Sequence, residues 1–357
     1  NLVIKHNAIL EVNLKNLAYN YRKLSSITNQ SICAATIKAD AYGIGVIKTF
    51  ETLYQNKCRH FFVATTEEAL EIRNKKSVAN VYVLNGLENN ELSIFNKNNI
   101  IPIINDKNEY NFVNKNIKKY KKLKFGIHID TGLNRLGLNP NDLLKINSDQ
   151  NKVHILISHL SSADEGKNNY NIFQNKKFKE AINLKINAKY NSLSNSMGII
   201  LGDNFHHDLV RPGISLYGGH YNTKMKKIIK PIISLKGKVL QIKELNKNEF
   251  VGYNQTFKTK QKIKVAILGI GYGDGISRVL SNKGHVYFKK KTFKIIGRVS
   301  MDSITVDISN NAKSIKVGDY MDIINHLNGI DKIAGQCNTI CHEILTSISK
   351  RVKRIYI

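Results

Sequence analysis

The chain has 357 residues and 42% of them are hydrophobic, which is enough for one large domain and a smaller second one. No stretch approaches the ~20 consecutive apolar residues of a membrane-spanning helix, and the first ten residues, which include Lys5 and His6, lack the apolar centre of a signal peptide. The net charge of +28 is spread along the chain without interleaved aromatic residues. It indicates a solvated basic surface, and neither a nucleic-acid nor a membrane partner is expected; nucleic-acid binding is kept as the weaker alternative.

The four cysteines suggest neither a zinc site nor a disulfide framework. Cys33 lies in an apolar run, Cys58 stands alone, and Cys337 and Cys341 are four residues apart in a helical pattern. Such spacing fits a reducing cytoplasm, and we expect no bound metal.

The first two thirds of the chain alternate short apolar runs with helical patterns. A helix is predicted from Leu14, with Asn13 as its N-cap, and another begins at Thr66. Eight candidate strands lie at residues 32–37, 61–64, 81–84, 100–104, 125–129, 153–158, 192–194 and 209–210. Eight repeats of strand and helix are typical of α/β proteins with parallel strands and predict a (β/α)8 TIM-type barrel.

After about residue 230 the pattern becomes β-rich. Strands are predicted at residues 232–240, 262–269, 285–288, 293–296, 303–308, 317–324 and 352–357, with one helix at residues 334–347. We therefore expect two domains, a barrel over residues 1–229 and a smaller β-rich C-terminal domain over residues 230–357.

Chemically capable side chains follow the predicted barrel strands, and in such barrels the active site lies at the carboxyl ends of the strands. In chain order they are Lys38, Arg135, His159, Ser196 and Arg211, after strands one, five, six, seven and eight. Lys38 is either a desolvated, reactive amine or an ordinary lysine that reaches the surface. Ser196 and the amides near Gly213 and Ile214 follow strands seven and eight, where barrels of this type often bind a phosphate. Considered by itself, Ser196 is more compatible with an ordinary loop serine.

Seven motifs in order resemble the bacterial alanine racemase family, a group of pyridoxal-5′-phosphate (PLP) enzymes of fold type III. The stretch ATIKADAYGIG at residues 35–45 resembles the family's PLP-lysine motif. The others are DTGLNRLG at 130–137, SHLSSAD at 158–164, RPGISLYG at 211–218, GYGDG at 271–275, GRVSMD at 297–302, and the ending at 343–347 and 354–356. They span both predicted domains.

The resemblance implies an isomerase that interconverts L-alanine and D-alanine and supplies D-alanine for bacterial peptidoglycan. It implies that Lys38 holds PLP covalently and acts as one proton-transfer group, with Tyr272 as the second on the opposite face of the substrate. In the family that tyrosine comes from the partner subunit, so a homodimer with shared active sites is expected. A serine or broad-specificity racemase of the same fold is the alternative, because side-chain size limits cannot be read from the sequence.

The resemblance also assigns the remaining site residues. The PLP phosphate would be bound by Tyr42, Ser196, Gly213, Ile214 and Tyr356. His159 would pack against the cofactor ring, and Arg211 would donate to its nitrogen; a guanidinium keeps its proton, which favours racemisation over transamination. Arg135 and the amide of Met301 would bind the substrate carboxylate.

One position departs from the family. Many relatives have a carbamylated lysine two residues before the Asp-Thr-Gly, where it holds the arginine that follows; here that position is His128. An imidazole cannot form the same stable carbamate, so activity is expected not to depend on added bicarbonate.

Overall fold

The computed structural model of the chain describes residues 6–28, 30–75, 77–144, 153–184 and 186–357; Lys5 lies outside them. The residues form two compact units. The β-rich unit contains Asn1–Asn16, Tyr42–Ile44 and Pro231–Ile357, and the barrel unit contains Leu17–Ala41 and Gly45–Lys230. The predicted domain ranges follow the chain without interruption, whereas the β-rich unit also takes in the first residues of the chain and a short piece around Gly43.

The barrel unit is built on parallel strands. They are β2 (Ile32–Cys33), β3 (Ala35–Thr36), β4 (His60–Val63), β5 (Asn80–Val83), β6 (Ile100–Ile104), β7 (Phe125–His128), β8 (Val153–Ile157), β9 (Tyr190–Ser192) and β10 (Leu209–Val210). Strands β3 to β9 form one sheet in chain order, and β10 pairs with β2. Main-chain bonds from Asp208 to Asn191 and from Arg211 to Ser194 connect β9 with β10. The predicted eight-stranded barrel is therefore confirmed, with its first strand split into β2 and β3.

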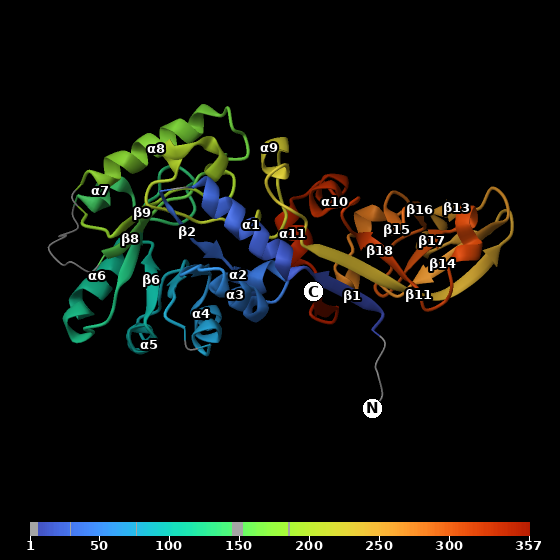
Figure 1. The fold of residues 1–357 in the computed structure, drawn as a ribbon, viewed down its shortest axis with the longest axis horizontal. Coiled ribbons are helices and arrows are strands. Elements are labelled where there is room, and N and C mark those ends of the chain that lie inside the picture. The colour runs from blue at the N-terminus through green and yellow to red at the C-terminus, as the bar shows by residue number, and fades with distance from the viewer. Residues whose placement is uncertain (1–5, 29, 76, 145–152, 185) are drawn as a thin grey trace. The chain divides into compact units, whose positions relative to one another are not determined.

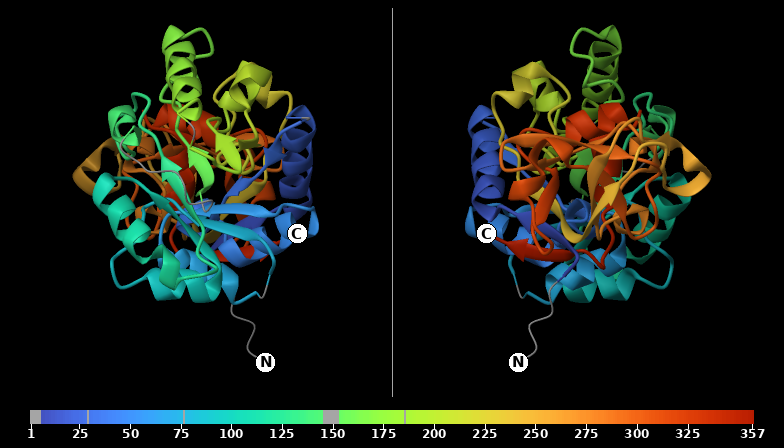
Figure 2. Two further views of the ribbon diagram at one scale, coloured as in Figure 1. Left: turned by 90° about the vertical axis from the view of Figure 1, so that its left-hand side faces the viewer. Right: turned by 90° about the vertical axis from the view of Figure 1, so that its right-hand side faces the viewer.

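Helices surround these strands (Figures 1 and 2). They are α1 (Leu14–Ile27), α2 (Lys38–Tyr42), α3 (Val46–Gln55), α4 (Thr66–Arg73), α5 (Leu92–Asn98), α6 (Lys107–Asn116), α7 (Pro140–Leu143), α8 (Asn169–Ile182) and α9 (Thr223–Lys226). Helix α1 begins as predicted, because the Asn13 side chain accepts a hydrogen bond from the Asn16 amide at 2.8 Å. Helix α4 begins with a capping box between Thr65 and Glu68. None of the described helices is long and apolar enough to cross a membrane.

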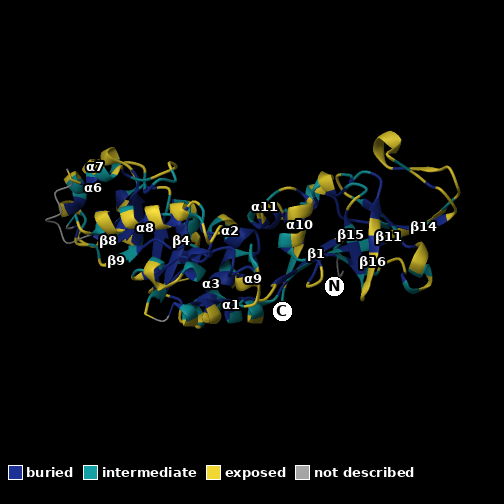
Figure 3. Cartoon of the chain, turned by 90° about the horizontal axis from the view of Figure 1, so that it is seen from above, coloured by how far each residue is buried: buried dark blue, intermediate teal, exposed yellow. Residues whose placement is uncertain are grey.

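Aromatic packing inside the barrel fixes the position of a buried cation. The rings of Phe62 and Tyr82 stack with centroids 4.3 Å apart, and both side chains are fully buried. The Arg211 guanidinium lies over the Phe62 ring, 5.8 Å from its centroid. Burying each such side chain contributes roughly 1.5–3 kcal/mol. Phe62 belongs to β4, all of whose residues are buried, and Figure 3 shows the region of β4 in the colour of buried residues.

The β-rich unit contains one large sheet. Its strands and those of a small hairpin are β1 (Ala8–Val12), β11 (Ile233–Leu245), β12 (Phe250–Val251), β13 (Phe257–Lys258), β14 (Ile263–Leu268), β15 (His285–Phe288), β16 (Lys291–Ile296), β17 (Ile304–Asp307), β18 (Tyr320–Ile324) and β19 (Lys353–Tyr356). The large sheet has the order β14-β17-β16-β15-β18-β11-β1-β19, and β14 also pairs with β11, so six strands close on themselves. Strand β1, which the sequence did not predict, pairs with β11 and β19 and so joins the start of the chain to this unit.

The single helix predicted over residues 334–347 is wrong. Two short helices, α10 (Ile330–Gln336) and α11 (Cys341–Thr346), replace it. Between them Asn338 has φ 54°, a left-handed conformation that a continuous α-helix cannot contain and that asparagine tolerates. The periodic apolar pattern thus continues across a break in the backbone.

Candidate active site

Lys38 follows β3 directly and opens an unusual left-handed turn. In α2 the φ angles of Ala39, Asp40 and Ala41 are 52°, 53° and 52°. Each L-residue in this conformation costs roughly 1–2 kcal/mol, so the surrounding structure must hold the turn in place.

Two carboxylates hold this turn. The Ala39 amide donates to Glu68 Oε1 at 2.6 Å, and the Val46 amide donates to Asp40 Oδ1 at 2.7 Å. Glu68 also accepts from the Ala64 amide at 2.7 Å, so it joins the first turn of α4 to the backbone beside Lys38. The position of the lysine is therefore fixed by charge-assisted bonds to its neighbours.

Lys38 is half-buried in a basic environment. Burial, and then the nearby charge of Arg135, lower the pKa of Lys38, while Glu68 opposes this shift. The Lys38 amine makes no hydrogen bond or ion pair with any described residue. A lysine with a lowered pKa has a larger neutral fraction and is a better nucleophile at neutral pH.

Arg211, after β10, is buried and rigidly oriented. Its Nη1 donates to Ser192 Oγ, and its Nη2 donates to the carbonyl oxygen of Ser158 and, at 3.5 Å, to that of Leu193. Burial lowers the pKa of Arg211 to about 9, which leaves the guanidinium protonated at neutral pH. These bonds use both Nη groups, and among the described residues the Nε–H has no partner. Three of the five N–H groups are thus used, and the Nε–H is one of the fixed donors that the arginine can still offer to a ligand.

Two imidazoles in the same region are kept neutral. Burial and the charges of Arg211 and Arg135 lower the pKa of His128 to about 4 and hold that of His159 well below its usual value. The charges of His128 and Lys38 also lower the pKa of His159, so these groups lie close enough to interact electrostatically. The carboxylates that act on them are Glu68 and Asp130. A cluster with this excess of cationic groups favours anionic ligands.

Arg135 lies in the loop between β7 and α7. Its side chain is exposed and makes no hydrogen bond to any described residue, whereas the loop itself is ordered by Asp130, which accepts from the amides of Gly132 and Asn134. Nearby, the buried His128 Nδ1 lies 2.9 Å from Asn105 Oδ1. Arg135 is thus held only through its backbone.

Ser196 and the loop after β10 form a compact donor site. The amides of Gly213 and Ser215 donate to Ser196 Oγ at 2.9 and 3.2 Å. The intervening amide of Ile214, a buried residue, has no hydrogen-bond partner among the described residues. Successive amides that converge on one point bind anions such as phosphate.

In the β-rich unit, Tyr272 and Met301 lie on two adjoining segments. Tyr272 opens the short helix η5 (Tyr272–Asp274); its amide donates to the Ser300 carbonyl, and the Gly273 amide donates to the Met301 carbonyl, both at 2.9 Å. Tyr272 and Met301 are 43% and 53% exposed as whole residues. Their backbone is fixed while their side chains face outward.

An ion-pair network ties these segments together. Arg351 Nε donates to Asp274 Oδ1 at 2.7 Å, and Arg351 Nη2 lies 3.1 Å from Asp274 Oδ2 and 2.8 Å from Asp302 Oδ1. Asp274 Oδ2 in turn accepts from the Gly271 amide at 2.9 Å. A Cβ on Gly271 would lie 2.2 Å from the Ser300 carbonyl oxygen, so only glycine permits this close approach. The pKa of Arg351 is raised by its bonds to both aspartates.

Tyr42 and Tyr356, predicted to bind the phosphate, also belong to the β-rich unit. The ring of the buried Tyr42 lies 5.6 Å from the His342 ring, and the Tyr356 hydroxyl donates to the Ile44 carbonyl at 3.0 Å. Of the predicted site residues, the barrel unit therefore holds Lys38, Arg135, His159, Ser196, Arg211, Gly213 and Ile214, and the β-rich unit holds Tyr42, Tyr272, Met301 and Tyr356.

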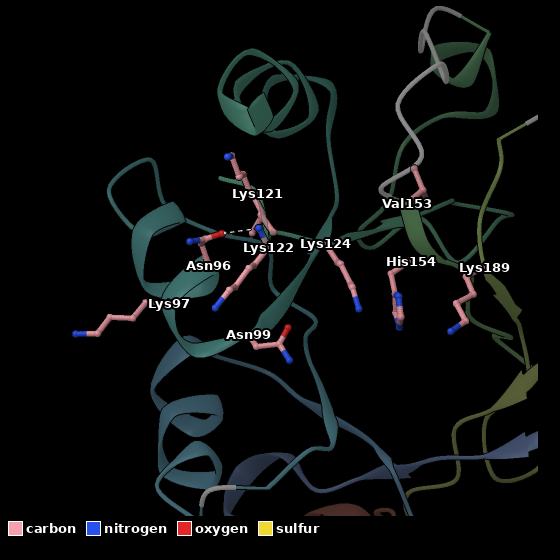
Figure 4. A pocket seen from close by; sticks show the side chains of 10 residues that line it. Asn96, Lys97, Asn99, Lys121, Lys122, Lys124, Val153, His154 and Lys189 are labelled. Carbon is pink, nitrogen blue, oxygen red and sulfur yellow. Dashed lines mark hydrogen bonds between the residues drawn. The ribbon is translucent and has the colours of Figure 1, made fainter. Parts of the chain in front are cut away.

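A cavity of about 670 Å³ lies elsewhere on the barrel unit (Figure 4). It is lined by Asn96, Lys97, Asn99, Lys121, Lys122, Leu123, Lys124, Val153, His154 and Lys189. Val153 is the first residue of β8, and Lys124 and Lys189 directly precede β7 and β9. The cavity thus lies at the amino ends of the strands, opposite the end where barrel active sites form.

Metal-binding groups are absent from the part of the chain that the structure describes. No three His, Cys, Asp or Glu side chains there are grouped so as to hold a metal ion. All four cysteines are buried, and none of them forms a disulfide bond.

Three residues that shape these sites were not singled out from the sequence: Glu68, Asn105 and Arg351. Glu68 was recognisable only as part of a helix start after Thr66. Asn105 follows β6 and so occupies the same end of the barrel as the predicted residues. Arg351 carried no sequence signal, because its partners Asp274 and Asp302 lie 77 and 49 positions earlier in the chain.

Comparison with known proteins extends over the whole chain. The family "Alanine racemase, N-terminal domain" matches residues 12–221, and "Alanine racemase, C-terminal domain" matches residues 232–356. The alanine racemase of Rickettsia africae is 36% identical over 98% of both chains, and that of Rickettsia bellii is 37% identical over 93% of this chain and 83% of its own.

Solved structures agree. Alanine racemase from Bartonella henselae, with covalently bound pyridoxal phosphate, has a TM-score of 0.93 and 36% identity over 99% of this chain and 100% of its own. Alanine racemase from Clostridium difficile 630 has a TM-score of 0.90 and 27% identity over 99% and 97% of the two chains. With both family domains matched in order over nearly its full length, this chain belongs to the alanine racemase family.

Proposed function

We propose that this chain is a PLP-dependent alanine racemase, an isomerase that interconverts L-alanine and D-alanine. The observation that carries the proposal is Lys38, an amine of lowered pKa held beside Arg135, His159 and Arg211 in a family of alanine racemases. The relatives' names support alanine as the substrate and PLP as the cofactor.

The residues fit a phosphate-bearing cofactor. Because the amides of Gly213 and Ser215 donate to Ser196 Oγ, the Ser196 hydroxyl hydrogen and the partnerless Ile214 amide between them remain as donors, and such donors suit a phosphate. Ser196, Gly213 and Ile214 would bind the phosphate. Tyr42 and Tyr356 are assigned to it by resemblance. Lys38 would hold the cofactor covalently, and His159 would pack against its ring.

PLP, when bound, withdraws electrons from the substrate's α-carbon so that its proton can leave. Lys38 then removes or returns that proton on one face, for which its lowered pKa suits it. On the other face Tyr272 of the partner subunit does the same. Two groups on opposite faces are needed because inversion requires the proton to leave one side and return on the other.

The remaining residues bind and orient. Arg211 would offer its Nε–H to the ring nitrogen of a bound cofactor without giving up the proton, because a guanidinium is a donor only. This limits electron withdrawal to what proton exchange needs. Arg135 and the Met301 amide bind the substrate carboxylate.

The proposed function also implies an oligomeric state and a cellular compartment. We infer a homodimer with shared active sites, which is supported by the exposed Tyr272 and Met301 side chains on a fixed backbone. We place the enzyme in the bacterial cytoplasm, where its D-alanine supplies peptidoglycan; four cysteines that form no disulfide bond are compatible with that compartment. Neither a nucleic acid nor a membrane is proposed as a partner.

The test is circular dichroism of L-alanine, and separately of L-serine, incubated with PLP-loaded protein and with the Lys38→Ala variant. We expect loss of the L-alanine signal with the wild-type protein and none with Lys38→Ala, with a slower rate for serine. A faster rate for serine would favour the serine or broad-specificity alternative. If the protein binds PLP and racemises neither amino acid, the proposed reaction is wrong.

A further inference from the structure

We propose that His128 is a positioning residue for substrate binding: its neutral ring, locked in one tautomer, offers Nε2 as the acceptor that orients Arg135 toward the substrate carboxylate. The inference rests on the proposed function, deepens it, and concerns residues of the barrel unit alone.

The hydrogen bonds of Asn105 determine the tautomer. Asn105 Nδ2 donates to the carbonyl oxygens of Leu84 and Ile103, both at 3.0 Å. The amide group is therefore oriented with Oδ1 toward His128, and an amide oxygen can only accept. His128 Nδ1, 2.9 Å away, must be the donor, which leaves the lone pair on Nε2.

The ring stays in that state at neutral pH. Burial first, and then the charges of Arg211 and Arg135, lower the pKa of His128 to about 4. Nε2 makes no hydrogen bond to any residue that the structure describes, although the side chain is buried. Nε2 is not among the fully enclosed atoms that lack a partner, so it is accessible and can accept a hydrogen bond from a donor brought to it.

Arg135 is the donor that the loop brings near. The Leu138 amide donates to the His128 carbonyl at 2.8 Å, so the loop that carries Arg135 returns to its starting point. At Gly137 a Cβ would lie 3.2 Å from His128 Cδ2, the ring carbon bonded to Nε2. Arg135 is two residues from Gly137, within about 7 Å along the backbone, a span that an arginine side chain can cover.

The chemistry of the two groups is complementary. A guanidinium has five N–H donors and no acceptor, and a carboxylate uses two of them in a bidentate pair. The others remain for Nε2. With no hydrogen bond of its own to a described residue, Arg135 would otherwise have to be ordered anew whenever substrate binds, which weakens binding.

Matched variants of the holoenzyme separate this role from a structural one. His128→Asn keeps a donor facing Asn105 but removes the acceptor at Nε2, and His128→Gln places an amide group near the Nε2 position. For His128→Asn we expect about a tenfold rise in KM for alanine and in Kd for propionate, a carboxylate without the amino group, with kcat changed less than twofold. His128→Gln should recover most of this loss.

Two further measurements decide the proposal. In an Arg135→Ala background, His128→Asn should change propionate binding no further; an undiminished effect there would overturn the coupling. Nitrogen NMR of [15N]histidine-labelled protein, with His128 assigned from the variant, should give an unprotonated Nε2 at pH 7, and a protonated Nε2 would also overturn it. Both readouts are independent of turnover, so absence of racemisation would reject the proposed function without deciding the role of His128.

Discussion

The barrel unit and the β-rich unit fix their functional residues by opposite means. Around Lys38, Arg211 and His159 the barrel unit buries cationic or ionisable side chains and shifts their pKa values. Around Tyr272 the β-rich unit leaves the side chain exposed and fixes the backbone through the Arg351 ion pairs. The barrel unit thus shifts the pKa values of its site residues by burial, whereas Tyr272, proposed to act in another subunit, is held in place through its backbone.

Acid should destabilise the barrel unit more than the β-rich unit. Burial lowers the pKa of His60, His128, His154 and His207 to about 4, against about 6.5 in an unfolded chain. Between pH 6.5 and 4 the unfolded state therefore binds protons that the folded state does not, and stability falls as pH falls. Each histidine can cost up to about 3 kcal/mol at pH 4.

The measurement is hydrogen exchange by mass spectrometry at pH 7 and pH 4.5, corrected for intrinsic rates. Peptides of the barrel unit, which contains all four of these histidines, should lose protection, while those of the β-rich unit serve as the internal control. Equal loss in both units would remove the contrast between them.

Breaking the ion-pair network should affect catalysis through Tyr272. Arg351→Met leaves the buried Asp274 carboxylate without its cation, and we expect the free energy of unfolding to fall by about 1–3 kcal/mol. If the network positions Tyr272 and Met301, kcat for alanine should fall roughly 10- to 100-fold, about 1.4–2.7 kcal/mol of transition-state stabilisation. Racemisation rates and urea unfolding measure the two effects.

Two controls interpret that result. Arg351→Lys keeps the charge and should restore part of the activity, and Asp302→Asn removes only the exposed pair and should change little. Loss of stability with unchanged kcat would reduce the network to a structural role.

The last prediction is that bicarbonate has no effect on the racemisation rate. The His128 imidazole cannot form a stable carbamate, and its Nδ1 is already hydrogen-bonded to Asn105. Added bicarbonate should therefore not change the racemisation rate. A rate that rises with bicarbonate, measured at constant pH and ionic strength, would contradict this and would show that the barrel unit also depends on a bound carboxylate.

Sequence reasoning anticipated the elements that have local signals. Apolar runs and helix caps such as Asn13 predicted the barrel strands and the first helix, because burial and capping act over a few residues. It missed β1, whose strand conformation depends on pairing with residues more than two hundred positions away, and the break at Asn338. Likewise the residues after each barrel strand could be named in advance, but the partners Glu68, Asn105 and Arg351 act through contacts that only folding creates.

The left-handed turn after Lys38 has a consequence for how sequence variation in this stretch is read. Ala39 and Ala41 occupy a backbone handedness in which valine, isoleucine or threonine would clash with their own main chain. The small residues of the lysine motif are thus imposed by backbone geometry and need not touch any ligand. Glycine and asparagine, which tolerate a left-handed backbone, should therefore be the accepted replacements at these positions. In a mutational scan, loss of activity there would reflect backbone strain and not the loss of a catalytic side chain.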